Sequence, residues 1–80
     1  MTSINYDAMF TDAQREVDKL EPGTVFEVRS LFKGTVWNSL QRGERSGFGR
    51  FFSSKYQSGA LPSIERVKRG KDNHRRYRKL

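Results

Sequence analysis

Along the first quarter of the chain, the apolar residues recur at the spacing of an amphipathic α-helix. Placed at about 100° per residue, they form one stripe, and Asp, Gln, Arg and Lys side chains lie opposite it. The stripe consists of Tyr6, Met9, Phe10, Ala13, Val17 and Leu20. Asn5 is the expected N-cap, and Pro22 with Gly23 ends the helix. We expect this stripe to face the core rather than a partner.

The middle of the chain alternates between strand-like and helix-like patterns. Residues 24–28, with the sequence TVFEV, have the Val, Thr and Phe content of a short strand. Helical spacing then returns up to Gly43 and is interrupted by Gly34, which fits one bent helix or two short ones. Its apolar positions are Leu31, Phe32, Val36, Trp37 and Leu40. We expect Trp37 in the core, because a Trp on the inner stripe of a small domain supplies much of the buried area; lining a pocket is its alternative role.

A third helix is predicted over residues 44–58, where aromatic and basic residues are interleaved. Phe48, Phe52 and Tyr56 recur every four residues and define its inward face. Four polar residues are expected on the opposite side, with Ser46 at the N-terminal end and Phe51 and Lys55 on the flank. The four are Arg50, Ser53, Ser54 and Gln57. Gly59 is the expected C-terminal cap.

The last segment changes to the pattern of a β-hairpin. Two extended runs, 64–69 and 74–79, flank the turn-rich sequence GKDN. The hairpin carries eight basic side chains, faced in this interpretation by no acid except Glu65 and Asp72. The basic residues are Arg66, Lys68, Arg69, Lys71, Arg75, Arg76, Arg78 and Lys79. Since such a hairpin would repel itself, an external anion is an attractive explanation for it.

The order helix, strand, helix, helix, basic hairpin predicts an α+β fold of the winged helix-turn-helix type, with residues 1–80 as one domain. Residues 44–58 would be the helix normally presented to nucleic acid. The strand at 24–28 can pair beside the hairpin to complete a three-stranded sheet.

Charge gives the first indication of function. The net charge is +7, but residues 1–41 hold four basic against six acidic side chains, whereas residues 42–80 hold twelve against three. Charge gathered in one half is typical of a polyanion-binding surface, and a solvated basic face is the alternative. The chain has no cysteine, no apolar run long enough to cross a bilayer and no secretory signal, so we expect a cytoplasmic protein without membrane contact.

Single-strand binders combine a cationic track with aromatic rings on which bases stack. We expect the track on the third helix and the hairpin, and the rings at Phe51, Tyr77 and Trp37; packing on the sheet is the alternative for Tyr77. The candidate nucleic-acid contacts are Arg45, Ser46, Arg50, Phe51, Ser54, Lys55, Arg66, Lys68, Arg69, Lys71, Arg75, Arg76 and Tyr77, and the candidate pocket residues are Trp37 and Phe48.

Three classes of function stay open. Duplex binding by a transcriptional regulator is the chief rival, although only Arg50 and Gln57 on the outer face of the third helix are long enough to read bases. RNA is a further candidate ligand. Self-association of the protein along the strand is also a candidate. A protein-binding inhibitor or adaptor encoded by a mobile element is the third class. An enzyme is not expected: His74 lies in a basic strand, the carboxylates are spaced as solubilising charge, and no cofactor or metal set is recognisable.

The run from Gly23 to Gly59, followed by the basic hairpin ending in NHRRYRK, resembles a family of small proteins on mobile elements and phages, long catalogued only as a domain of unknown function. The resemblance covers residues 23–80. Its features are Gly23, Phe26, Leu31, Phe32, Trp37, Leu40, Arg45, Gly49, Arg50, Phe52, Gly59, Asn73 and Tyr77. Members include the single-stranded DNA-binding protein of staphylococcal cassette chromosome elements, a winged helix-turn-helix used where an OB-fold would be usual.

The resemblance implies single-stranded DNA binding and an apolar pocket that is unusual for winged helices. It also suggests service in replication, transfer or protection of a mobile element or phage. Since the sequence ends at Leu80, we expect no tail of the kind that such proteins can use to recruit others.

Overall fold

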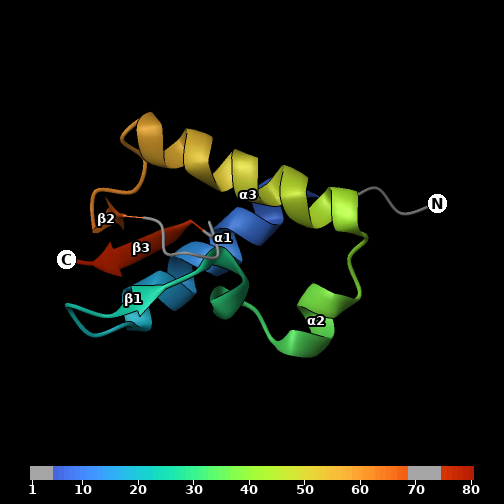
Figure 1. The fold of residues 1–80 in the computed structure, drawn as a ribbon, viewed down its shortest axis with the longest axis horizontal. Helices are drawn as coiled ribbons and strands as arrows, with labels where there is room; N and C mark the ends of the chain where they lie inside the picture. Colours follow the sequence, from blue (N-terminus) through green and yellow to red (C-terminus); the bar gives the residue numbers. More distant parts are fainter. Residues whose placement is uncertain (1–4, 69–74) are drawn as a thin grey trace.

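The computed structural model describes residues 5–68 and 75–80. Within these residues the order of elements is helix, strand, two short helical segments, long helix and two strands (Figure 1). They are α1 (Tyr6–Lys19), β1 (Val25–Phe26), the 3-10 helix η1 (Val28–Leu31), α2 (Gly34–Asn38), α3 (Arg42–Gln57), β2 (Ile64–Val67) and β3 (Arg76–Lys79). The predicted α+β winged helix-turn-helix is confirmed, with its C-terminal hairpin as the wing.

α1 has the start and the buried face predicted for it. The Asn5 side chain accepts a hydrogen bond from the Ala8 N–H at 3.1 Å, as an N-cap should. Phe10, Ala13 and Val17 are buried, and the other members of the stripe are half-buried against the same core. The helix is therefore held by its apolar face, and its acidic face is left to solvent.

Between α1 and α3 the structure departs from the pattern. The strand predicted over 24–28 spans only Val25–Phe26, because the backbone turns at Val28 into η1. Of the two alternatives for the next region, two short segments is correct, since Phe32 and Lys33 are extended between η1 and α2. Gly34 begins α2 instead of breaking a longer helix.

α3 is the longest element, and its two ends have specific caps. It begins at Arg42, before the predicted start, where the Gln41 N–H donates to the Glu44 Oε1 at 2.7 Å. At the other end Gly59 has φ +86°, and its N–H donates to the Tyr56 carbonyl. The N–H of the next residue reaches the Lys55 carbonyl, which completes a Schellman motif and confirms the predicted glycine cap.

The faces of α3 are mostly as predicted. Phe48 and Phe52 are both 0 % exposed, and Tyr56 is half-buried on the same side. Ser53, predicted on the outer face, is instead buried, because the Arg66 side chain reaches across from β2 and donates to its Oγ. The wing thus covers more of α3 than the four-residue spacing indicates.

The sheet joins an early strand, β1, to the two C-terminal strands. Its order is β1-β3-β2, so β3 is the central strand and pairs antiparallel with both neighbours. Phe26 and Arg66 lie opposite Tyr77 from either side. The predicted pairing of the early strand beside the hairpin is confirmed. Figure 1 shows the strands near the C-terminal end of α3 and α2 near its N-terminal end.

Aromatic rings fill most of the core. Phe10 and Phe52 pack edge to face with their centroids 5.9 Å apart, and Phe52 meets Tyr77 in the same way at 5.2 Å. This chain of rings connects α1 through α3 to the sheet. None of the helices in residues 5–68 and 75–80 has the length and apolarity that crossing a bilayer requires.

Candidate nucleic-acid interface

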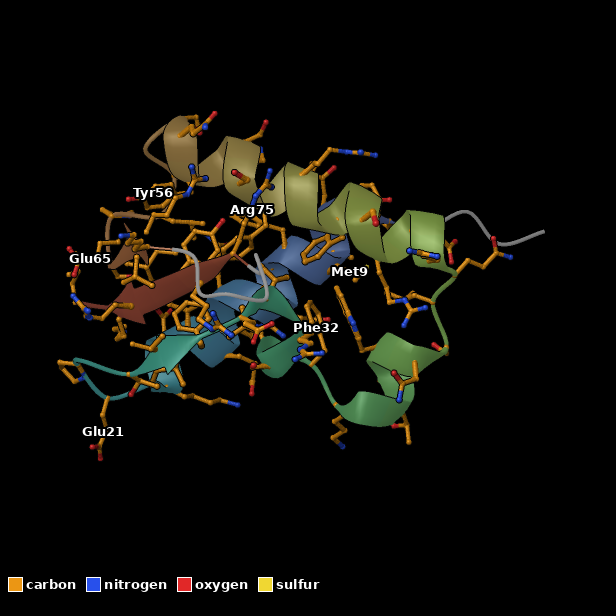
Figure 2. All side chains as sticks on the ribbon, viewed as in Figure 1. Met9, Glu21, Phe32, Tyr56, Glu65 and Arg75 are labelled. Carbon is orange, nitrogen blue, oxygen red and sulfur yellow. The ribbon has the colours of Figure 1, made fainter. Side chains whose placement is uncertain are left out.

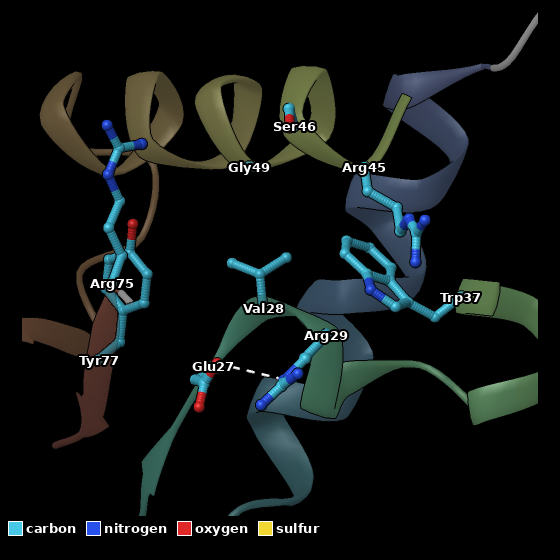
Figure 3. A pocket seen from close by; sticks show the side chains of 9 residues that line it. All are labelled: Glu27, Val28, Arg29, Trp37, Arg45, Ser46, Gly49, Arg75 and Tyr77. Carbon is cyan, nitrogen blue, oxygen red and sulfur yellow. Dashed lines mark ion pairs between the residues drawn. The ribbon is translucent and has the colours of Figure 1, made fainter. Parts of the chain in front are cut away.

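A cavity of about 320 Å³ lies between α3 and the wing. Arg45, Ser46 and Gly49 line it from α3, and Arg75 and Tyr77 line it from the wing. Figure 3 shows α3 along one side of this space, the wing strand at one end and α2 at the other. The cavity therefore lies between the two elements that the sequence marks as the cationic ones.

Trp37 closes the α2 end of the cavity. Its ring stacks on Phe32 with a centroid separation of 5.6 Å and meets the edge of Phe48 at 6.5 Å. It is half-buried, so it packs against the core and also lines the cavity. Both roles considered for Trp37 thus apply. Phe48 is fully buried behind it and supports the ring without lining the cavity.

The wing contributes a buried tyrosine and an arginine. Tyr77 is 0 % exposed; its ring stacks on Phe26 at 5.9 Å and meets Phe52 and Tyr56 edge to face. Of its two expected roles, the structure therefore places Tyr77 in packing on the sheet. Arg75 is half-buried and extends from the wing toward α3 (Figures 2 and 3).

Arg66 is fixed in place on the same face of the hairpin as Tyr77. Its guanidinium lies 5.3 Å from the Tyr56 ring centroid and 5.9 Å from that of Tyr77, and it donates to the Ser53 Oγ. This arginine is held by two rings and a hydroxyl while remaining exposed. Lys68, just beyond β2, is also exposed.

Carboxylates compensate part of the basic charge, and more of it than predicted. Glu65 pairs with Arg78 at 2.7 Å, as its position in the hairpin suggests. The expectation that only Glu65 and Asp72 face the wing is wrong, because Glu27 approaches Arg76 at 3.6 Å and Arg29 at 3.2 Å. Pairing of β1 with β3 brings Glu27 there from far along the chain.

Other arginines have no such compensation. Within residues 5–68 and 75–80, no carboxylate lies within ion-pair distance of Arg45, Arg50 or Arg75. Arg45 and Arg75 line the cavity, whereas Arg50 is exposed on the outer face of α3 beside Ser54. The uncompensated positive charge is thus divided between the cavity and the outer face.

Two further predicted contacts lie on the side of α3 that packs against α1. Phe51 is half-buried with its ring 5.6 Å from Tyr6 and 5.9 Å from Phe10. The Lys55 ammonium lies 5.3 Å from the Phe51 ring centroid. Neither residue lines the cavity. Arg69, Lys71 and His74 lie outside the described residues.

Four residues that line the cavity, Glu27, Val28, Arg29 and Gly49, were not among the sequence candidates. Val28 and Arg29 belong to η1, and Glu27 precedes it. No local pattern marks them, because their position depends on where η1 turns. Gly49 does have a signal in the sequence. A glycine inside a helix costs free energy, so its presence there suggests that something needs the space of its missing side chain.

Comparison with known proteins gives a family but no activity. The family model of a domain of unknown function, DUF1413, matches residues 11–79. The chain belongs to this family. The DUF1413 match begins inside α1 and so includes most of a helix that fits the sequence resemblance, over residues 23–80, less well. No curated protein and no solved structure matches the chain.

Proposed function

We propose that this protein binds single-stranded DNA, with little sequence preference, through the cavity between α3 and the wing. One observation carries the proposal. Arg45 and Arg75 line the same cavity as Trp37, the sole tryptophan, and neither arginine has a carboxylate partner within the described residues.

The physical argument combines charge with an aromatic surface. Uncompensated arginines attract phosphates and release counterions on binding, which favours any nucleic acid regardless of sequence. A tryptophan accessible from a cavity offers a surface to a base, and each such contact contributes about 1–3 kcal/mol in single-strand binders. Bases of a duplex are stacked on one another and cannot enter a cavity, so the combination favours a single strand.

Duplex binding is the second candidate, and Arg50 is the observation that favours it. This arginine is exposed on the outer face of α3, the face that a winged helix normally presents to the major groove. Its long polar companion there is Gln57, also exposed, which is a small set for reading base edges. Binding of a duplex through this face would therefore rest on phosphates.

The deciding experiment compares fluorescein-labelled single-stranded DNA, duplex DNA and RNA of equal length by fluorescence anisotropy at one salt concentration. We expect the single strand to bind most tightly. Replacing Arg45 by Ala should weaken single-strand binding and flatten the salt dependence by about 0.7 in slope for each phosphate that is no longer neutralised. The matched control is Arg15→Ala on α1, which removes the same charge from an exposed residue that pairs with Asp12 at 3.6 Å.

The outcomes separate the candidates. Tighter binding to the duplex, with sensitivity at Arg50 and not at Arg45, would establish the second candidate in place of the first. No binding to any of the three nucleic acids would leave the protein-binding adaptor. The proposal places the protein in the cytoplasm, where single-stranded intermediates of a mobile element would be copied, transferred or protected.

A further inference from the structure

The Tyr77 hydroxyl is a buried polar group without a partner. The ring lines the cavity, the whole residue is 0 % exposed, and within the described residues the hydroxyl oxygen makes no hydrogen bond. Figure 3 shows this oxygen at the end of the ring that points toward α3. Buried hydroxyls are normally hydrogen-bonded, because desolvation without a partner costs free energy. A partner that enters from the cavity would remove that cost.

The opposite wall is kept open by a glycine. A Cβ built on Gly49 has no atom within 4 Å outside its own helix neighbourhood, so the space beside α3 is empty of protein. Val28 and Trp37 supply the apolar and aromatic parts of the lining. With a volume of about 320 Å³, the cavity lies at the lower end of the range of small-ligand sites. Its size and lining suit one flat heteroaromatic ring.

The charges around the cavity indicate what accompanies that ring. Arg45 and Arg75 have no carboxylate partner in the described residues, whereas the one acid of the lining, Glu27, is paired with Arg29 and Arg76. The remaining charge therefore favours an anion beside the ring. A nucleotide combines a heteroaromatic ring, a hydrogen-bonding edge and an adjoining anion.

We propose that the cavity takes a single unstacked base of the bound strand, in contact with Trp37 and hydrogen-bonded at its edge to the Tyr77 hydroxyl. Arg45 and Arg75 hold the adjoining phosphates. This inference rests on the proposed single-strand binding and adds where one nucleotide is held. A hydroxyl both donates and accepts, so it can pair with the edge of any of the four bases, in keeping with weak sequence preference.

The test fills the cavity without disturbing the fold. Gly49→Leu places a side chain in the open space, and a leucine favours the helix more than a glycine does. Gly43→Leu is the control, since Gly43 is exposed in the first turn of α3 and lines no part of the cavity. Tyr77→Phe removes only the unpaired oxygen. Melting temperature is measured for each variant, so that binding is compared among folded proteins.

The ligands are oligothymidylate of about 15 nucleotides, an abasic strand of equal charge, and thymidine monophosphate. We expect Gly49→Leu to weaken oligothymidylate binding by about tenfold or more, and Tyr77→Phe by a smaller factor at an unchanged or higher melting temperature. Gly43→Leu should bind as the wild type does. Thymidine monophosphate should change the fluorescence of Trp37 in the wild type and not in Gly49→Leu. The abasic strand should bind the wild type more weakly than oligothymidylate does. Its affinity for the wild type and for Gly49→Leu should be equal.

The results separate failure of this inference from failure of the proposed function. Normal oligothymidylate binding by Gly49→Leu overturns the base site while leaving single-strand binding intact. Normal binding by Tyr77→Phe overturns the assigned hydrogen bond. If the wild type responds to thymidine monophosphate but not to any strand, the cavity is a site for free nucleotides and the strand-binding proposal fails. If neither ligand binds, both proposals fail.

Discussion

The contact between α1 and α3 allows a prediction about three glycines of the same helix. Replacement by alanine should stabilise the protein at two of them and destabilise it at the third. Gly43, Gly47 and Gly49 are all in α3, and Ala in place of a helical glycine normally stabilises by about 0.5–1 kcal/mol. A Cβ at Gly43 or Gly49 meets nothing within 4 Å, so both substitutions should give this gain. At Gly47 the added carbon would overlap the Tyr6 hydroxyl oxygen.

The cost at Gly47 follows from what the tyrosine does there. Its hydroxyl donates to the Glu44 carbonyl at 3.2 Å, a bond worth about 0.5–1.5 kcal/mol, and forcing a methyl into a packed contact costs about 1–3 kcal/mol. After the helix gain is subtracted, Gly47→Ala should destabilise the protein by about 0.5–4 kcal/mol. Since 1 kcal/mol shifts the melting temperature of so small a domain by about 4–8 °C, the difference from Gly43→Ala is easily measured.

Thermal unfolding followed by far-UV circular dichroism is the assay, and a double variant is its internal check. Adding Tyr6→Phe to Gly47→Ala removes the overlapping oxygen and leaves the ring carbon at 3.2 Å as the nearest atom, so part of the stability should be recovered. If Gly47→Ala raises the melting temperature as much as Gly43→Ala does, Tyr6 does not pack against α3 in this way and the reasoning is refuted.

Three further predictions concern the core and the charges. Phe52→Ala should cost about 3–5 kcal/mol and unfold much of the protein, whereas Phe51→Ala should cost less because its ring is only half-buried. The single-strand affinity of Phe51→Ala should be unchanged, because Phe51 does not line the cavity. Urea unfolding and anisotropy measure the two effects, and equal destabilisation would contradict the assigned burial. Arg75→Ala should weaken single-strand binding more than Arg76→Ala does, because the Arg76 side chain already pairs with Glu27. Equal weakening by the two substitutions would place both arginines on the path of the strand. Arg50→Ala should change the melting temperature little and reduce duplex affinity more than single-strand affinity, and the reverse order would move the strand to the outer face of α3.

Periodicity was a reliable guide wherever an element buries one face along its whole length. The stripe of α1 and the spacing of Phe48 and Phe52 in α3 follow from the geometry of an isolated helix, so the residues alone indicate which side faces the core. The glycine cap at Gly59 is equally local. The hairpin could be recognised because its pattern is also local to the sequence. Its strands, Ile64–Val67 and Arg76–Lys79, are shorter than the predicted runs 64–69 and 74–79.

What could not be predicted depends on contacts between distant segments. The burial of Ser53 requires an arginine from β2, and the pairing of Glu27 with Arg76 requires β1 to lie beside β3. Neither relation has a signature in either segment. The cavity is of the same kind: its arginines and Trp37 were candidates, but their meeting around Gly49 depends on how α2, η1 and the wing close on α3.

The central place of β3 also sets the order in which the molecule can fold. β1 has no partner other than β3 in the described sheet, and almost the whole remaining sequence must be synthesised before that partner exists. Until then the Phe26 ring lacks the Tyr77 ring on which it stacks. Contacts between residues so far apart in sequence are slow to form, because the intervening chain must lose its freedom first. A nascent chain on the ribosome can therefore form its helices early, but its Phe26 ring must stay without this partner until β3 has emerged from the exit tunnel.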